Sequence, residues 1–376
     1  MTDLTRPIMS KPIRYRAPDF TAPHLKNAPT ARTVAAERDG VLPDGFFATT
    51  NLPTYVKGAD GSWTLPHEPR MDGVLVRDAQ GQWWVREGRR VKQGDAVVIG
   101  AAEDGSEGML VHASGFTGEA SAHGDFHFMS SQVSREKPID YGSIARMLVE
   151  EKRRGGYTIW VTGPALVHSR ARDNLVWFIR SGYVQALLAG NAVAVHDIEA
   201  AIVGTTLGMT SEGEPTVGGH AAHMRAINAV RRAGSIANAV GAGLITGGIM
   251  HACTVEEVPY VLSGSIRDDG PLPGVYTDAV AAQEATRTHA IRATMAVMIA
   301  TALHSIAVGN MLPSYYTDAA GDLRELPTIC VDASEFVVSK LKDRGTHQAV
   351  GVVTNAQDFM SILRAAVERE VAGDAG

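Results

Sequence analysis

The sequence predicts an α/β protein in which a mostly parallel sheet domain follows a smaller, antiparallel, β-barrel-like domain. Three observations support this fold class. Short runs of strand formers separated by turn residues occupy residues 46–129, whereas apolar runs alternate with helical periods after Pro138. The chain has 376 residues, which suggests two domains. Several apolar runs end in small or polar residues, as buried parallel strands do at the edge where α/β folds bind ligands.

The first part of the chain is expected to hold an arm and a small β domain. Residues 1–40 are basic and interrupted by prolines, which is typical of an arm lying over a surface. Residues 41–137 form the β-rich domain, because short runs of strand formers are separated by turns that contain glycine. The predicted strands lie at residues 46–50, 73–77, 82–86 and 96–100, which indicates a small antiparallel barrel or sandwich.

Residues 138–376 form the second predicted domain, in which helices and strands alternate. Strands are predicted at residues 157–162, 259–263, 328–331 and 349–354, and one or two more within 184–195 around Gly190 and Asn191. Helices are predicted at residues 141–154, 171–180, 220–232, 235–240, 276–308 and 357–370. The apolar run at 290–312 carries Arg292, His304 and Asn310, so we expect a buried core helix and no membrane span.

The composition is that of an ordinary globular enzyme, with 45% hydrophobic and 20% charged residues. A net charge of −6 and a pI of about 6.1 argue against a nucleic-acid partner. Cys253 and Cys330 cannot build a disulfide framework and fit a reducing cytoplasm. Neither cysteine belongs to a C-x-x-C pair, so no metal site is expected. The start of the chain lacks the apolar stretch of a secretory signal.

Three segments are predicted to form the walls of a nucleotide-dependent active site: LAGNAVAVHD (188–197), SGSIRDDGP (263–271) and TALHSIAVGN (301–310). Helix N-termini that follow parallel strands offer free N–H groups to phosphate. The usual glycine-rich fingerprint is missing, because the first strand is followed by Gly163 alone. Asp332 follows a strand and has two interpretations, a ligand for ribose hydroxyls or a plain helix N-cap.

Other polar residues in these segments also have two interpretations. Arg267, Asp268 and Asp269 form either a solvated turn or the mouth of a site that binds an amino acid, with the arginine on a carboxylate. His304 is either a core histidine or part of a cofactor pocket, and Cys253 is either a pocket thiol or a buried, inert one. The motif at residues 196–199, His-Asp-x-Glu, is interpreted as structural.

Long stretches of the chain resemble the family of archaeal-type ornithine cyclodeaminases. This family is related to the carboxy-terminal part of bifunctional arginine dihydrolase/ornithine cyclodeaminases and to the so-called LOR/SDH conserved region. The resemblance spans residues 42–363 and rests on TTNLPTYV (49–56), GYVQALLAGNAVAVHDIE (182–199), RAINAVRRAGSI (225–236), LSGSIRDDGPLPGVYTDAV (262–280), ATALHSIAVGNMLPS (300–314) and DRGTHQAVGVVTNAQDF (343–359).

The resemblance implies that the second domain is Rossmann-like and binds NAD. The NAD contacts it implies are Asn191, Ala192, Asp269, Thr301, Ala302, Leu303, His304, Asp332, Asn355 and Ala356. This chain departs from its relatives at two places. The pair Asn355-Ala356 replaces Asp-Val at one of the implied contacts, and an insertion at residues 315–326 separates the His304 segment from Asp332 at the edge of the site.

The implied reaction converts L-ornithine to L-proline and ammonia, with a hydride lent to NAD and then returned. Such a reaction needs a buried base with a tuned pKa, for which position suggests Asp268, Asp278 and His251. Cys253 is a candidate to line the pocket, and Arg267 is a candidate to hold the substrate carboxylate. The alternatives are an NAD(P)-linked oxidoreductase or a cyclodeaminase acting on a related amino acid or cyclic imine, and a nucleotide-binding regulator without activity. The arm and the long helical stretch suggest a homo-oligomer.

Overall fold

The computed structural model describes residues 15–116, 139–210, 214–217, 219–268, 270–344 and 349–373. The described chain divides into two compact units. Unit 1 holds the described residues up to Phe116 together with Leu312–Leu326, and unit 2 holds the other described residues. None of the helices in the described ranges is long and apolar enough to cross a bilayer.

Six strands of the described chain form one parallel sheet in unit 2, in the order β10-β9-β8-β11-β14-β15. Along the chain this order is third, second, first, fourth, fifth and sixth, which is the doubly wound order of a Rossmann fold. The Rossmann-like prediction is therefore confirmed, and the order reverses between β8 and β11. The strands are β8 (Thr158–Thr162), β9 (Ala186–Gly190), β10 (Tyr260–Ser263), β11 (Met295–Ile299), β14 (Thr328–Asp332) and β15 (Ala349–Val353).

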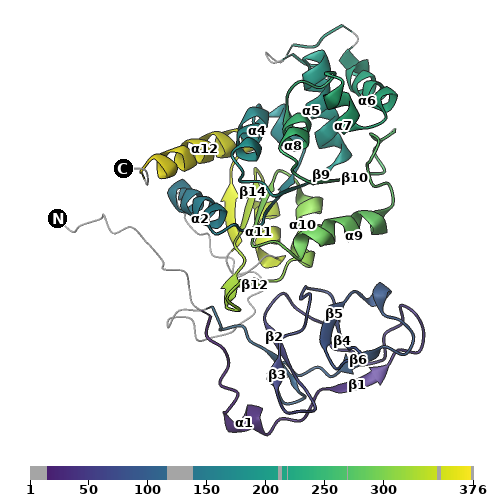
Figure 1. Cartoon of the computed structure of the whole chain (residues 1–376), viewed down its shortest axis with the longest axis vertical. Coiled ribbons are helices and arrows are strands. Elements are labelled where there is room, and N and C mark those ends of the chain that lie inside the picture. Colours follow the sequence, from purple (N-terminus) through teal and green to yellow (C-terminus); the bar gives the residue numbers. More distant parts are fainter. Residues whose placement is uncertain are drawn as a thin grey trace, which may run out of the picture. The chain divides into compact units, whose positions relative to one another are not determined.

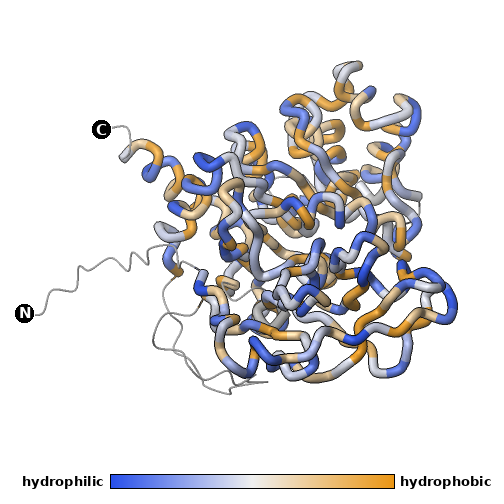
Figure 2. Tube along the Cα trace, turned by 60° about the horizontal axis from the view of Figure 1, so that its bottom comes forward, coloured by the Kyte–Doolittle hydropathy of each residue, from blue (hydrophilic) through white to orange (hydrophobic). Residues whose placement is uncertain are grey.

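Helices cover the sheet of unit 2, as Figure 1 shows. One group packs together and shares a hydrophobic core with the sheet: α2 (Tyr141–Arg153), α4 (Arg172–Arg180), α5 (Asn191–Val203), α8 (Ile249–Val255) and α12 (Ala356–Gly373). A second group forms the crossovers on the other side of the strand-order reversal: α9 (Ala279–Ala290), α10 (Ala302–Met311) and α11 (Glu335–Arg344). Short elements complete the unit: α3 (Ala165–His168), η2 (Gly219–Ala221), α6 (Ala222–Ala233) and α7 (Ile236–Gly241). Hydrophobic and hydrophilic colours alternate along α12 in Figure 2, as expected of a helix with one buried face.

Two predicted elements of unit 2 were wrong. The helical stretch at 276–308, with its single core helix over 290–312, is interrupted by β11. All five residues of β11 are buried, and its sequence Met-Ala-Val-Met-Ile suits a buried parallel strand as well as a buried helix. The strand expected to continue to residue 195 ends at Gly190, and Asn191 begins α5. The remaining predicted helices and strands of this unit are present, with shifts of one to three residues at their ends.

Unit 1 holds three antiparallel sheets in its described residues, one of them a two-stranded hairpin, which confirms its predicted antiparallel character. The first sheet has the order β1-β6-β4-β5 and the second has the order β3-β2-β7. The strands are β1 (Arg32–Ala35), β2 (Thr54–Lys57), β3 (Trp63–Thr64), β4 (Val74–Arg77), β5 (Trp83–Arg86), β6 (Ala96–Ile99) and β7 (Met109–Val111), with α1 (Pro23–Lys26) and η1 (Gly88–Arg90) beside them. Part of the segment expected to be an arm is therefore a paired strand, since β1 pairs with β6.

The expected insertion at residues 315–326 is a β-hairpin made of β12 (Tyr315–Thr317) and β13 (Leu323–Glu325). This hairpin belongs to unit 1, although it lies between α10 and β14 in the chain. The Ser314 backbone N–H donates to the Asn51 carbonyl at 2.8 Å, which ties the start of the hairpin to the loop before β2. The hairpin therefore adds to unit 1 without interrupting the order of the parallel sheet.

Candidate functional site

The carboxyl edge of the parallel sheet gathers the predicted cofactor residues, because all six strands run the same way. Asn191 and Ala192 follow β9, Thr301–His304 follow β11, and Asp332 ends β14. Asn355 and Ala356 follow β15. Residues far apart in the sequence therefore share one edge of unit 2. Asp269, which was predicted with them, lies outside the described residues.

A cavity of about 490 Å³ opens at this edge, beyond the ends of β9 and β10. We call it the strand-end cavity. Its walls come from the start of α5, from α6 and from the loop after β10, and its lining includes Pro164, Gly190, Asn191, Ala192, His196, Leu207, His223, Ser263, Arg267 and Asp268. Four predicted site residues, Asn191, Ala192, Arg267 and Asp268, thus line a single cavity.

The N-terminus of α5 faces the strand-end cavity without a side-chain cap. Gly190 is the N-cap residue and has no side chain to accept a hydrogen bond. Side-chain caps are present elsewhere in unit 2, since Asp140 and Ser235 accept hydrogen bonds from the first turns of α2 and α7, although α4 and α6 also begin without one. Free N–H groups at a helix start attract phosphate or carboxylate groups. The end of β9, the second strand of the parallel sheet along the chain, is therefore a candidate site for an anion.

Asn191 also holds the loop that covers the cavity. Its side chain is 5% exposed, and its Oδ1 accepts a hydrogen bond from the Leu272 backbone N–H at 3.1 Å. In the same loop, Asp268 Oδ2 accepts from the Ser265 N–H at 2.8 Å. Sequence reasoning assigned Asn191 to the cofactor alone, whereas its side chain also determines where the 265–272 loop returns to the sheet.

The reversal point between β8 and β11 is closely packed. A Cβ added to Gly163 would lie 1.8 Å from the Ala300 carbonyl oxygen, so a side chain is excluded there. Ala300 has a φ of 55°, an unusual conformation for a residue with a side chain. This strained turn leads directly to Thr301 and the start of α10. Strain that persists at a strand end is common where a ligand is held.

The predicted cofactor residues beyond the reversal point have different surroundings. Leu303 is 82% exposed, whereas His304 is half-buried, and burial lowers the pKa of its imidazole. Asp332 Oδ1 accepts a hydrogen bond from the Ser334 N–H at 2.9 Å, and Asn355 Oδ1 accepts one from the Asp358 N–H at 2.8 Å. Asn355 directly precedes α12 and caps its first turn, whereas the Asp332 bond closes a turn ahead of Glu335, where α11 begins, so Asp332 is not the N-cap of that helix.

The residues predicted to act on the substrate are not brought together. Arg267 and Asp268 line the strand-end cavity, but Asp278 is an exposed N-cap whose Oδ1 accepts from the Ala281 N–H at 2.7 Å. His251 and Cys253 lie on α8, outside the lining of that cavity. Cys253 is 1% exposed in the hydrophobic core, and burial raises the pKa of its thiol far above the usual range. This placement matches the inert interpretation of Cys253.

In the motif at residues 196–199, Asp197 has a structural role and His196 lines the cavity. Asp197 is fully buried and accepts hydrogen bonds from Arg172 Nε at 2.6 Å and from the backbone N–H groups of Ile249 and Met250 at 2.8 Å. It therefore caps α8 from another helix. His196, in the second turn of α5, lines the strand-end cavity instead. Sequence reasoning missed this placement because it assigned the run Ala-Val-Ala-Val to a strand, in which the helical neighbours of His196 are not apparent.

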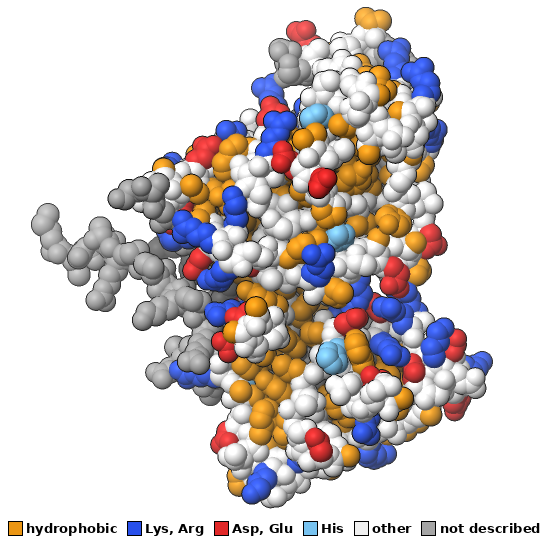
Figure 3. Space-filling view, in the orientation of Figure 1, with side chains coloured by type: hydrophobic (Ala, Val, Ile, Leu, Met, Phe, Trp, Pro, Cys, Tyr) orange, Lys and Arg blue, Asp and Glu red, His pale blue; other side chains and the backbone are white. Residues whose placement is uncertain are grey.

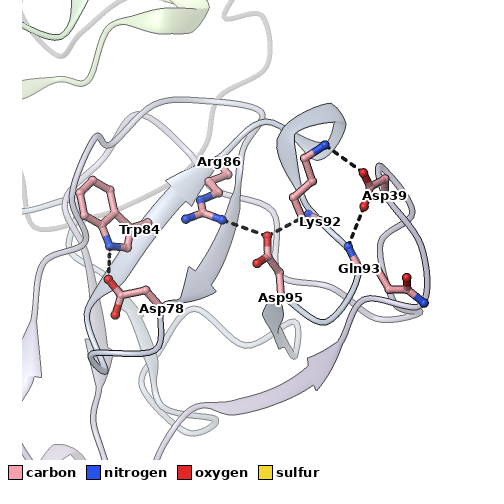
Figure 4. A network of polar contacts seen from close by, with 7 residues as sticks. All are labelled: Asp39, Asp78, Trp84, Arg86, Lys92, Gln93 and Asp95. Atoms are coloured by element: carbon pink, nitrogen blue, oxygen red, sulfur yellow. Dashed lines mark hydrogen bonds and ion pairs between the residues drawn. The ribbon is translucent and has the colours of Figure 1, made fainter.

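A second cavity, of about 460 Å³, lies in unit 1 and is lined by Glu68, Trp84, Val85, Arg86, Arg89, Arg90 and Lys92. We call it the basic cavity. Figure 4 shows that two of its cations are paired: Arg86 Nη1 donates to Asp95 Oδ2 and Lys92 Nζ donates to Asp39 Oδ2, both at 2.9 Å. Acidic and basic side chains are also interspersed on the face drawn in Figure 3. Within the described ranges, no group of three or more His, Cys, Asp or Glu side chains is arranged to hold a metal ion.

Comparison with known families gives two matches that together span most of the chain. Residues 142–363 match the family described as arginine dihydrolase ArgZ-like, C-terminal, Rossmann fold. Residues 53–142 match the first region of the same C-terminal part. The two matches meet at the start of α2, the first helix of unit 2.

Curated relatives and solved structures agree with these matches. The chain is 44% identical to an ornithine cyclodeaminase of Methanopyrus kandleri over 337 residues, which covers 88% of this chain and 77% of the relative. A crystal structure of a conserved putative LOR/SDH protein from Methanococcus maripaludis is 42% identical, with a TM-score of 0.80 over 91% of this chain and 99% of that one. The ternary complex of AgrE with ornithine and NAD+ is 34% identical, with a TM-score of 0.58, and this chain covers 92% of its own length and 47% of that protein.

Proposed function

Because the chain belongs to the ornithine cyclodeaminase family, which includes the C-terminal part of ArgZ-like arginine dihydrolases, we propose that it is an NAD-dependent enzyme that converts L-ornithine to L-proline and ammonia. Bound NAD would supply a hydride acceptor and return the hydride, so that the reaction has no net redox change. The protein's part is to position the amino acid, to exclude water and to move protons. The observation that carries the proposal is the strand-end cavity, which combines an uncapped helix start with an arginine and an aspartate.

The residues of the sheet edge fit a dinucleotide. The uncapped start of α5, at Asn191 and Ala192, suits a phosphate group, and Gly163 allows close packing at the reversal point. We propose that these residues, together with Thr301–His304, Asp332 and the Asn355-Ala356 pair, hold the cofactor. The side chain of Asn355 is used as a helix cap, so we expect this residue to contribute mainly through its backbone.

The charged loop after β10 fits the amino-acid substrate. Arg267 is exposed at the mouth of the strand-end cavity and can hold a carboxylate through two parallel N–H groups. Asp268 is half-buried and keeps one carboxylate oxygen outside its hydrogen bond to the Ser265 N–H, so that oxygen is available to an ammonium group. A basic amino acid carries both of these groups.

The direct test incubates the purified protein with L-ornithine and NAD and measures ammonia and proline. The expected result is equal amounts of the two products with no lasting change in absorbance at the wavelength of NADH. Arg267→Lys should raise KM for ornithine more than it lowers kcat, because the lysine keeps the charge but not the two-pronged geometry. Asp173→Asn, an exposed change on α4, serves as the matched control.

Two results would contradict the proposal. NADH that accumulates in proportion to product would indicate a net oxidoreductase acting on an amino acid or imine. Binding of NAD without ammonia release from ornithine or lysine, and without reduction of a cyclic imine by NADH, would indicate a regulator. Ornithine and lysine differ by one methylene, which a pocket discriminates by only about 1–3 kcal/mol, so both amino acids belong in the assay.

A further inference from the structure

His196 is held in a definite orientation at the strand-end cavity. Its imidazole is 13% exposed, and its Nδ1 lies 3.1 Å from Glu199 Oε2, one helical turn further along α5. Next to a carboxylate, Nδ1 carries the proton and donates it, so the lone pair of the neutral ring is on Nε2. Nε2 makes no hydrogen bond to any residue in the described part of the chain, and the ring lines the cavity. The free nitrogen is therefore the basic one.

Glu199 is well suited to support a charge on His196. It is fully buried and accepts hydrogen bonds from Thr205 Oγ1 at 2.9 Å and from the Gly208 backbone N–H at 2.9 Å, in addition to the one from His196. Burial by itself would raise the pKa of Glu199, but the hydrogen bonds, led by that from His196, lower it below the usual value. A buried carboxylate that stays ionised stabilises an imidazolium beside it.

His168 packs against His196 from α3. The two ring centroids are 4.6 Å apart at an interplanar angle of 62°, and His168 Nδ1 is buried without a hydrogen-bond partner among the described residues. Burial, and after it the neighbouring His196, lower the pKa of His168, although Glu199 opposes this. His168 is therefore neutral at pH 7 and restrains the ring of His196 without competing for the proton.

The remaining ionisable groups that face the cavity come from two other elements. His223 lies on α6, and Arg267 and Asp268 lie on the loop after β10. Neither Asp278 nor His251 lines the cavity, so the two other bases that position along the chain suggested are not placed to act there. Among the described residues that line the cavity, His196 alone combines a buried carboxylate partner with a free nitrogen at the wall.

We propose that His196 is the proton acceptor of the site and that Glu199 is the residue that positions it. This inference rests on the proposed function. The N–H bond of a substrate ammonium group breaks, its proton bonds to Nε2, and the nitrogen keeps the electron pair as a free amine. The positive charge passes to the imidazolium, which Glu199 stabilises. The imidazolium returns the proton to the leaving amine when ammonia departs, so the residue ends the cycle as it began.

The test compares His196→Gln with His24→Gln, an exposed histidine of unit 1. His196→Gln should lower kcat for ornithine by about 10²–10⁴-fold and leave the dissociation constant of NAD within about twofold of the wild-type value. Ammonia release by the wild-type protein should fall on the acid side of its pH profile, and that limb should be absent in the remaining activity of His196→Gln. His24→Gln should match the wild type in both respects.

Glu199→Gln tests whether Glu199 positions His196 or has only a structural role. The neutral amide keeps a hydrogen bond to Nδ1 but no longer stabilises the imidazolium, so the acid limb should move to lower pH while NAD still binds. A purely structural role would leave the acid limb at its wild-type pH, whatever the change in melting temperature. Added imidazole should partly restore turnover to His196→Ala, which is a second measure of proton transfer.

The proposal is wrong if His196→Gln keeps the wild-type kcat, or if the wild-type profile, which needs no variant, shows no acid limb of this kind. Failure of the proposed function gives a different result, because the wild-type protein would then release no ammonia from ornithine. In that case the same variants are compared on the amino acid or imine that is turned over.

Discussion

The basic cavity of unit 1 and the strand-end cavity of unit 2 are similar in size, at about 460 and 490 Å³, but differ in how their charges are held. In unit 1, exposed or half-exposed cations face carboxylates of neighbouring turns, as Figure 4 shows. In unit 2, the carboxylates of Asp197 and Glu199 are buried and each is assigned to a definite partner. Exposed charges on a cavity wall are therefore weak evidence for a functional site. Buried charged groups that orient a reactive side chain are stronger evidence.

The comparison is tested most strongly at Asp197. Asp197→Ala leaves the guanidinium of Arg172, whose side chain is 20% exposed, without its carboxylate and uncaps α8. Loss of one partner of a buried pair should lower the free energy of unfolding by about 3–5 kcal/mol. Denaturant unfolding measures the effect, and Asp173→Ala, at an exposed position one residue along from Arg172, should change it by less than about 0.5 kcal/mol. Equal effects of the two variants would contradict the assignment.

The second prediction concerns the reversal point of the sheet. Gly163→Ala places a Cβ 1.8 Å from the Ala300 carbonyl oxygen, so the turn before Thr301 must shift. Overpacking of this kind should cost about 1–3 kcal/mol and weaken NAD binding. Gly190→Ala is a matched control for stability, since its Cβ would lie 3.8 Å from the Ser263 oxygen and Gly190 has a φ of −85°. If the two variants unfold at the same denaturant concentration, the contact between residue 163 and the Ala300 carbonyl oxygen does not restrict the side chain at position 163.

The third prediction is a pH dependence that Glu199 causes. Its folded-state pKa is lowered, so its carboxylate stabilises the protein above the unfolded pKa of about 4.3, and this contribution is lost as pH falls through the folded value. At neutral pH, Glu199→Gln should lower the free energy of unfolding by about 1–3 kcal/mol. Below the unfolded pKa, the free energy of unfolding of this variant should fall less with pH than that of the wild type. The exposed substitution Glu256→Gln should reproduce the wild-type acid dependence, and a Glu199→Gln profile parallel to the wild type would disprove this assignment.

The smallest effect is expected in unit 1. Asp95→Asn weakens the pair with Arg86, whose side chain is 33% exposed, and keeps an oxygen that can accept from the Lys92 N–H. The free energy of unfolding should fall by about 1 kcal/mol or less, and ornithine turnover should be unchanged. A loss of turnover comparable to that of His196→Gln would mean that the basic cavity acts in the reaction, and the contrast between the two units would fail.

The sequence predicts the strands that end in small or polar residues, since that pattern depends on burial and on local turns. It cannot distinguish a buried strand from a buried helix when the residues are Met, Ala, Val and Ile, which is why β11 was missed inside a helical stretch. The sheet edge was predictable because parallel strands bring their ends together. The grouping of His168, His196 and Glu199 was not, because it requires α3 to lie against α5, and neither element has a periodic pattern that reports the contact.

The hairpin of β12 and β13 has a consequence for dissecting the molecule. The chain leaves unit 2 after Met311, contributes the hairpin to unit 1, and returns to unit 2 at Pro327. A fragment that starts at residue 139 would carry this hairpin without the Asn51 carbonyl that accepts the Ser314 N–H, and a fragment that ends at residue 116 would lack the hairpin altogether. Exchange of unit 1 or unit 2 between relatives therefore requires the replacement of at least two separate segments of the chain. Truncation at a single boundary separates the hairpin from the rest of unit 1.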